Sequence, residues 1–176
     1  PPSPEIAERI FREASSTPKP VIINFLGSRA LSGSPENNIY IAYTLEKAAQ
    51  ITANLALGKV PLPEEDTPLV PSTKRDDALA DSQKYIRGLY SGGTFCYEAQ
   101  LLMIDELDAV WSMTPVENKF SLNDPLRSTG HTVIDLGDDF FTQGRPHPMI
   151  DQRSRRERLL QEASDPECAV ILFDVV

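Results

Sequence analysis

Apolar residues open the chain at helical spacing and then gather into short runs that are almost wholly apolar. Ile6, Ile10 and Ala14 follow Ser3-Pro4, a pair typical of a helix N-terminus, so a helix is predicted from residue 4. The run at 21–26 lacks the alternation of a half-exposed strand and indicates a strand buried on both faces, as in a parallel sheet. The other predicted elements of this part are a second such strand at 39–42 and a helix that Thr44 caps.

The pattern after residue 84 predicts a parallel α/β unit. Strands are predicted at 84–90, 133–136 and 169–176, the last an almost fully apolar run. Helices are predicted at 95–103, with 106–110 as an extension, and from 151 or 152 to 163. Strand, helix, strand, helix, strand gives a parallel βαβαβ sheet. Because no helix follows the last strand, this part is expected to be a fragment, a cleaved piece or a subunit that a partner completes.

A stretch rich in proline and carboxylates separates these two parts. Residues 58–84 hold four prolines, at 61, 63, 68 and 71, and show almost no periodic apolar pattern. That composition predicts an extended, solvated linker. The predicted organisation is therefore a partial domain at 1–57, the linker at 58–84 and a second partial domain at 85–176, and the predicted fold class is α/β.

Composition narrows the range of partners. The chain has 17 Lys and Arg against 26 Asp and Glu, a net charge of −9 that disfavours nucleic acid and anionic membranes as partners. No apolar run approaches the ~20 residues that span a bilayer, and the first residues lack a signal-peptide pattern, so a cytoplasmic protein is expected. Cys96 and Cys168 are interpreted as reduced core thiols. His131 and His147 lack zinc-ligand spacing, so no metal site is predicted.

Three loops at the predicted carboxyl ends of strands carry candidate chemistry, because ligands of parallel α/β sheets gather at that edge. The first is Ser91-Gly92-Gly93-Thr94, where backbone N–H groups at a helix N-terminus could bind a phosphate or carboxylate. Its alternative role is a tight turn that needs positive φ. The second loop is Asp135 to Asp139, whose acidic groups could bind Mg²⁺, pair with a substrate amine or cap a turn; its site candidates are Gly137, Asp138 and Asp139.

The third loop, 144–151, holds Arg145 and His147 among prolines. Arg145 could bind a carboxylate or phosphoryl group through two parallel hydrogen bonds, and His147 could transfer a proton near neutral pH, although a histidine in such a place is more often inert. Arg145, His147 and Asp139 are thus the catalytic candidates. The arginines that follow, at 153, 155, 156 and 158, are interpreted as a solvated helix face paired with Glu157 and Glu162.

These segments together resemble the FdrA family of acyl-CoA-synthetase-like proteins, which are related to both chains of succinyl-CoA synthetase. The residues that carry the resemblance are 88–94, 133–140, 144–151 and 171–176. The resemblance implies flavodoxin-like parallel sheets, with 1–57 similar to the last part of the alpha-chain ligase domain and 85–176 similar to the first part of the beta-chain domain.

The resemblance also implies an activity. FdrA-like proteins are associated with oxamate carbamoyltransferase, which converts oxalurate and phosphate to oxamate and carbamoyl phosphate in purine and allantoin breakdown, together with other subunits. In the synthetases, a histidine in the loop after a strand like 21–26 relays the phosphoryl group, but the loop here, 27–34, has no histidine, so that relay is not expected. Acyl-CoA synthesis with nucleotide hydrolysis and a non-catalytic assembly role remain as alternatives. A small anionic substrate is expected, phosphate, CoA and Mg²⁺ stay open as cofactors, and the expected partners are other subunits or a missing half of the same protein.

Overall fold

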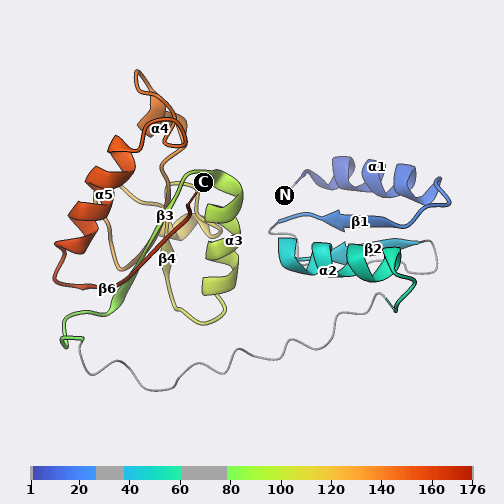
Figure 1. Cartoon of the computed structure of the whole chain (residues 1–176), viewed down its shortest axis with the longest axis horizontal. Helices are drawn as coiled ribbons and strands as arrows, with labels where there is room; N and C mark the ends of the chain where they lie inside the picture. The colour runs from blue at the N-terminus through green and yellow to red at the C-terminus, as the bar shows by residue number, and fades with distance from the viewer. Residues whose placement is uncertain (1, 27–37, 61–78, 176) are drawn as a thin grey trace. The chain divides into compact units, whose positions relative to one another are not determined.

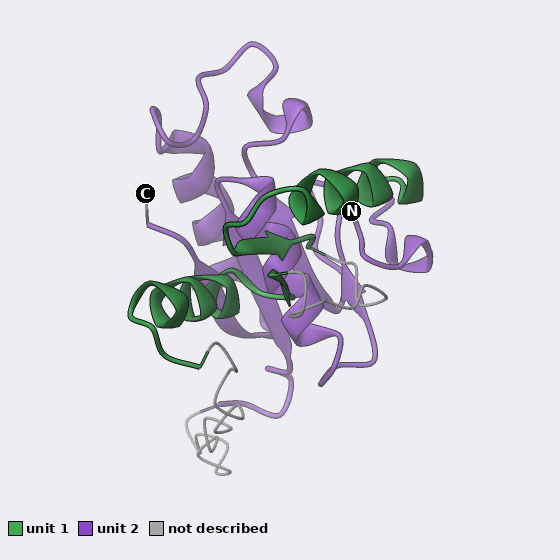
Figure 2. Cartoon of the chain, turned by 90° about the vertical axis from the view of Figure 1, so that its right-hand side faces the viewer, with its two compact units in different colours: residues 1–73 green, residues 74–176 purple. Residues whose placement is uncertain are grey.

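The computed structural model describes residues 2–26, 38–60 and 79–175. The chain forms two compact units, Pro1–Thr73 and Lys74–Val176, which Figure 2 colours separately. Most of the predicted linker and the whole loop at 27–34 lie outside the described residues. Within the described ranges, no helix is long and apolar enough to cross a membrane.

The first unit pairs two parallel strands with two helices (Figure 1). The helix caps are those the sequence predicts: the Ser3 hydroxyl accepts a hydrogen bond from the Ile6 amide at 3.4 Å, and the Thr44 hydroxyl accepts one from the Lys47 amide at 3.2 Å. The predicted strand at 21–26 ends two residues early, at Asn24. The elements are α1 (Pro4–Ser15), β1 (Val21–Asn24), β2 (Ile39–Ala42) and α2 (Leu45–Ala56).

The second unit is an α/β fold around a parallel sheet of four strands in the order β4-β5-β3-β6. The strands, in chain order, are β3 (Tyr85–Tyr90), β4 (Val110–Trp111), β5 (His131–Asp135) and β6 (Cys168–Phe173). The helices are α3 (Gly93–Met103), α4 (Asp139–Thr142) and α5 (Arg153–Ala163), with a 3-10 turn, η2, at Asn118–Phe120. The predicted helical extension at 106–110 is wrong, because Val110 is buried in a short strand that pairs with β5.

Two apolar clusters cover the two faces of this sheet, since neighbouring residues of a strand point to opposite sides. Leu89 and Ile134 face α5 and pack with its Leu159. Tyr90 and Val133 face α3 and pack with its Cys96. The two crossover helices therefore lie on opposite faces of the sheet (Figure 1).

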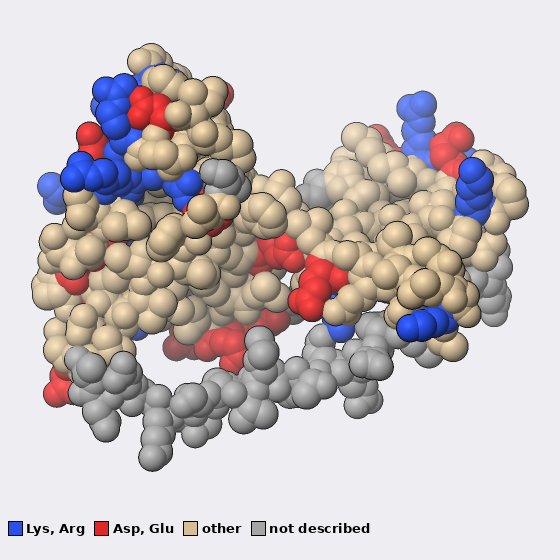
Figure 3. Space-filling view, in the orientation of Figure 1, with Lys and Arg blue, Asp and Glu red and all other residues tan. Residues whose placement is uncertain are grey.

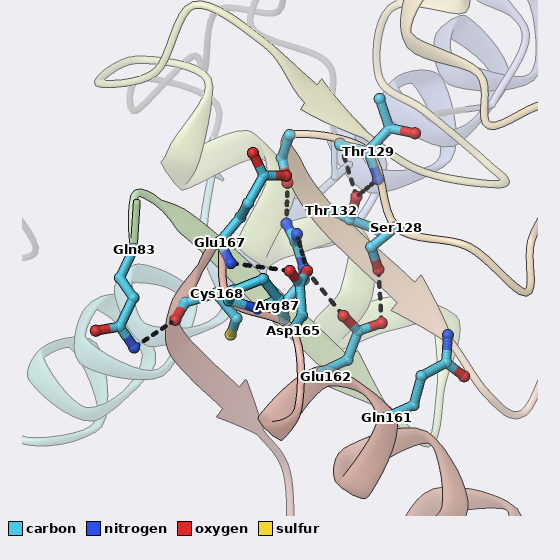
Figure 4. Close-up of polar contacts among 12 residues, drawn as sticks. Gln83, Arg87, Ser128, Thr129, Thr132, Gln161, Glu162, Asp165, Glu167 and Cys168 are labelled. Atoms are coloured by element: carbon cyan, nitrogen blue, oxygen red, sulfur yellow. Dashed lines mark hydrogen bonds and ion pairs between the residues drawn. The ribbon is translucent and has the colours of Figure 1, made fainter. Parts of the chain in front are cut away.

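Helix α5 buries some of the charged side chains that its sequence suggests are solvated. Arg158 and Glu162 do form the expected i,i+4 pair, at 2.6 Å, but their side chains are only 5% and 2% exposed. Glu162 also accepts a hydrogen bond from Arg87 of β3 at 3.0 Å (Figure 4). The solvated-face interpretation is confirmed for Arg153 and Arg156, which are exposed, and is wrong for Arg155 and Arg158. The side of α5 that bears Arg158 and Glu162 packs against the sheet, where an isolated charge would be costly and a paired one is tolerated.

Candidate functional site

The carboxyl edge of the second unit is held together by hydrogen bonds between its loops. The Leu136 amide after β5 donates to the Tyr90 carbonyl at the end of β3, at 2.7 Å. Asp174, directly after β6, accepts hydrogen bonds from the Ser91 amide at 3.0 Å and from the Ser91 hydroxyl at 3.1 Å. Three segments that are far apart in the sequence are thereby fixed at one edge.

Arg155 of α5 completes the contact around Asp174. Its Nη2 donates to a carboxylate oxygen of Asp174 at 2.9 Å and also to the Asp174 main-chain carbonyl. The two side chains are 12% and 11% exposed, and Ser91 is fully buried. Ser91 therefore already bonds an internal carboxylate, and its role in ligand binding, which remains a prediction, would require Asp174 to leave.

The start of α3 still offers free donors. Gly92 is the N-cap residue and provides no side-chain cap, and the three residues that follow are exposed. In the described part of the chain, the amides of Gly93, Thr94 and Phe95 have no hydrogen-bond partner, as expected for the first turn of an uncapped helix. The predicted anion-binding run thus keeps donors at Gly93 and Thr94 and extends to Phe95.

Glycine at position 92 is not explained by the fold. Gly92 has φ −169°, an extended conformation that any residue adopts, so the alternative of a turn with positive φ is wrong. A Cβ atom added at Gly92 would meet nothing within 4 Å. Neither backbone strain nor packing among the described residues requires the missing side chain, whereas close approach of a ligand to the amides would.

Asp135, the first acidic residue of the second loop, faces the start of α3. One of its carboxylate oxygens accepts the Gly137 amide at 2.8 Å, and the other lies 3.2 Å from where a Cβ atom on Gly93 would sit. Burial raises the pKa of Asp135, and the nearby carboxylates of Asp138 and Asp174 raise it further, against the opposite effects of the Gly137 amide and His147. Burial therefore favours the protonated form of the Asp135 carboxyl group.

His147 is the candidate from the third loop that the structure brings to this edge. Its Nδ1 accepts the Met149 amide at 3.2 Å, which leaves Nε2 to carry the proton of the neutral ring. That Nε2 lies 2.6 Å from the position of a Cβ atom on Gly137. His147 therefore packs directly on the glycine of the second loop, within the same group of segments as Ser91 and Asp135.

Arg145 and the two remaining acidic candidates lie differently. Arg145 is exposed and lines a surface pocket with Arg153 and Glu157, and no residue of 91–94 or 135–139 lines that pocket. Figure 3 shows Lys and Arg side chains gathered at this end of the second unit, around α4 and the start of α5. Asp138 caps α4 by accepting the Phe140 amide at 2.9 Å, which confirms its turn-capping role, and Asp139 is exposed.

Neither the two cysteines nor the residue types that bind metal ions form a second reactive site among the described residues. Cys96 and Cys168 are both buried, as predicted, and burial raises the pKa of Cys96 to about 12. Among the described residues, no three or more His, Cys, Asp and Glu side chains are grouped to hold a metal ion. The chemistry of the edge therefore centres on the α3 amides, Asp135 and His147.

Replacing Asp135 with Asn is expected to stabilise the protein at neutral pH. Because the folded pKa of Asp135 is raised, its favourable contribution is present below the ordinary value of 3.8 and is lost as the pH rises through the folded pKa. Asn keeps the oxygen that accepts the Gly137 amide and removes the charge. The thermal midpoint should rise at pH 7, and the gain should shrink as the pH falls towards 3.8. Asp139→Asn, at an exposed position, serves as the control; an equal gain at every pH would contradict the explanation.

Comparison with known proteins identifies the family to which the sequence belongs. Residues 89–176 match the family model described as CoA-ligase. The uncharacterized protein YahF of Escherichia coli (strain K12) is 38% identical over 179 residues, covering 100% of this chain and 34% of that protein, so the chain spans about a third of this relative. No solved structure matches. Since the family model covers half of the chain, this protein belongs to the CoA-ligase family.

Proposed function

We propose that this chain is part of an FdrA-like enzyme that binds a phosphorylated ligand at the start of α3 and assists carbamoyl transfer between oxalurate and phosphate. The observation that carries the proposal is the uncapped first turn of α3, with an N-cap glycine that the fold does not require. An oxyanion would supply the acceptors that the amides of Gly93, Thr94 and Phe95 lack, and it would be favoured by the helix dipole.

The proposed reaction needs few protein groups. An oxygen of phosphate attacks the ureido carbonyl carbon of oxalurate, the bond from that carbon to the amide nitrogen breaks, and the nitrogen takes a proton to give oxamate and carbamoyl phosphate. The α3 amides would hold the phosphate, and His147 or protonated Asp135 would supply the proton. Arg145, which is exposed in its own pocket, remains a candidate for binding the oxalurate carboxylate. No phosphohistidine is needed in this scheme.

The charges at the carboxyl edge predict that phosphate binding depends on the protonation of Asp135. Arg155 already pairs with Asp174, so this carboxylate adds little net charge. Among the residues that the structure describes, no Lys or Arg is bonded to Asp135, which would repel a phosphate at the start of α3 when it is ionised. Its raised pKa lessens that repulsion, because a larger fraction of the protein carries the proton at a given pH. Phosphate binding should therefore weaken as the pH rises.

A second candidate function is CoA ligation driven by nucleotide hydrolysis, which the match to the CoA-ligase family favours. The two candidates require different co-substrates, so one set of assays separates them. The chain, assembled with its partner subunits, is incubated with oxalurate and phosphate, and separately with CoA, a carboxylic acid and ATP or GTP. Carbamoyl phosphate formation supports the proposal. CoA-dependent nucleotide hydrolysis supports the alternative, and inactivity in both arms contradicts both and leaves an assembly role.

Gly92→Ser is expected to change folding stability and ligand binding in opposite directions. A serine hydroxyl at the N-cap can accept an amide of the first turn, which should raise the free energy of unfolding by a few tenths of a kcal/mol. The same hydroxyl competes with phosphate for that amide, so phosphate affinity should fall by roughly tenfold, the equivalent of one hydrogen bond. Amide chemical shifts of Gly93, Thr94 and Phe95 during a phosphate titration measure the affinity. Unchanged affinity in a more stable variant would remove these amides from the site.

A further inference from the structure

The groups that hold the Asp174 side chain are those that proteins use to bind oxyanions. One carboxylate oxygen accepts the Ser91 amide at 3.0 Å, and the other accepts the Ser91 hydroxyl at 3.1 Å and Nη2 of Arg155 at 2.9 Å. A backbone amide, a hydroxyl and a guanidinium together are a donor set typical of phosphate and carboxylate binding. Ser91 is fully buried and Arg155 is 12% exposed, and Gln152 accepts a further hydrogen bond from Arg155 at 3.1 Å. The Asp174 carboxylate therefore lies where a bound oxyanion would find donors of suitable chemistry.

The donors around Asp174 lie next to those at the start of α3. Ser91 directly precedes the N-cap residue Gly92, and the amides of residues 93–95 have no hydrogen-bond partner in the described part of the chain. The Asp174 carboxylate has only two oxygens, and both are already bonded at Ser91 and Arg155. A phosphate group offers more oxygens and a larger charge, so it could accept hydrogen bonds from Ser91, Arg155 and the free amides together. An external phosphate thus matches the whole donor set better than the internal carboxylate does.

Neighbouring carboxyl groups weaken the binding of the Asp174 side chain in its present place. Burial raises the pKa of Asp135, and the charges of Asp138 and Asp174 raise it further. The repulsion between Asp135 and Asp174 opposes the attraction of Arg155 whenever Asp135 is ionised. An aspartate side chain turns about two torsions, and the next residue, Val175, is 86% exposed, so water lies close to the carboxylate. A rotation of this side chain is therefore enough to free its donors for a ligand.

We propose that Asp174 is an internal substitute for the ligand: the phosphate group that binds at the start of α3 displaces the Asp174 carboxylate and takes over its hydrogen bonds to Ser91 and Arg155. This inference rests on the proposed function, and it adds Arg155 and the Ser91 side chain to the ligand site. In both states Arg155 keeps an anionic partner, so its largely buried guanidinium is never left unpaired. The exchange also makes the site selective, because a ligand must compete with a carboxylate that is already paired.

Titration of the 176-residue chain with inorganic phosphate tests the exchange. The amide shifts of Ser91 and residues 93–95 and the Nε shift of Arg155 are followed by NMR, and all should change over the same range of phosphate concentration. In Asp174→Asn, which keeps an acceptor oxygen but removes the competing charge, phosphate affinity should rise about tenfold, the order of one charge-assisted hydrogen bond. Asp108→Asn, the same change at an exposed position before β4, should leave the affinity unchanged.

The outcomes separate this inference from the proposed function. If phosphate shifts the amides at 93–95 but leaves Ser91 and Arg155 unchanged, the inference is overturned and the proposed function stands. The same conclusion follows if Asp174→Asn binds phosphate no more tightly than Asp108→Asn. Absence of any response in both the wild type and Asp174→Asn would overturn the inference and the proposed function together.

A matched pair of arginine variants tests the role of Arg155. In the Asp174→Asn background, Arg155→Gln should lower phosphate affinity by about tenfold. Arg156→Gln, at the next residue, which is exposed, should change the affinity by less than about twofold. The background variant has no carboxylate at position 174, so removal of Arg155 leaves no unpaired charge there that would unfold the protein. Equal losses in the two variants would show only a general effect of charge and would overturn the assignment of Arg155 to the ligand site.

Discussion

Glu162→Gln is expected to lower the free energy of unfolding by about 3–5 kcal/mol, the range found when one partner of a buried ion pair is removed. Glu162 accepts hydrogen bonds from three side chains: Arg87 at 3.0 Å, Arg158 at 2.6 Å and Ser128 at 2.6 Å. Its side chain is 2% exposed, as is that of Arg87. Glutamine keeps the size but removes the charge and turns an amide donor towards a guanidinium.

The large loss follows from the charges around Glu162. Arg87 and Arg158 are balanced by Glu162 and by Asp165, whose pKa the Arg87 guanidinium holds below its ordinary value. Figure 4 shows Arg87 bonded to both Glu162 and Asp165. Without Glu162, Arg87 keeps Asp165 as its carboxylate partner, and Arg158 keeps none among the described residues. Both guanidinium groups are buried, so the cost of desolvation and repulsion is not relieved by a small shift.

Chemical denaturation of both forms measures this effect. Glu157→Gln makes the same chemical change at an exposed position of the same helix and should alter stability by no more than about 0.5 kcal/mol. Similar small losses in the two variants would show that the buried network contributes little and that α5 is held mainly by its apolar contacts.

Local sequence signals were enough to predict most of the elements. Ser3 and Thr44 act as helix caps, because capping depends on residues within one turn of each other. The runs that became β5 and β6 were predicted as strands because their apolar content is continuous. Strand β4 was missed because two residues cannot show a period, and only pairing with β5 makes them a strand.

The burial of the charged side chains and the contact between Ser91 and Asp174 could not be predicted in the same way. Arg158 and Glu162 are four residues apart, so their pairing was foreseen, but their burial depends on Arg87, which lies 75 residues from Glu162 in the sequence. Likewise, Ser91 was recognised as a donor, while its partner Asp174 follows 83 residues later. Such pairs are brought together by the order of the strands in the sheet. A short stretch of sequence does not reveal that order.

Gly137→Ala is expected to disrupt the carboxyl edge more than any other single methyl group added there. The new Cβ atom would lie 2.6 Å from Nε2 of His147, 2.8 Å from the carbonyl oxygen of Ser91 and 3.1 Å from a carboxylate oxygen of Asp135. Distances below about 3 Å are not tolerated, and the Ser91 oxygen belongs to a main chain that Asp174 holds in place. We therefore expect a loss of about 1–3 kcal/mol in the free energy of unfolding.

The same clash should reduce the proposed carbamoyl-transfer activity beyond its effect on stability. Moving the Ser91 segment displaces the start of α3, and a misplacement of about 1 Å in a catalytic group lowers rates by roughly 100-fold. Turnover of the assembled enzyme and denaturation of the purified variant are measured together. Wild-type turnover in Gly137→Ala would show that the positions of Ser91 and His147 do not matter to the reaction.

A double variant separates the two contacts that the alanine would make. In Gly137→Ala combined with His147→Ala, the imidazole is gone but the Ser91 carbonyl still faces the new methyl group at 2.8 Å. Stability should recover only in part, because a side chain can be removed whereas the main chain of the β3–α3 connection cannot move freely. Full recovery would assign the whole strain to His147 and would mean that the segment entering α3 is free to adjust. In the proposed function, the rigidity of that segment is what would allow fixed amides, rather than a flexible side chain, to hold an anion at this edge.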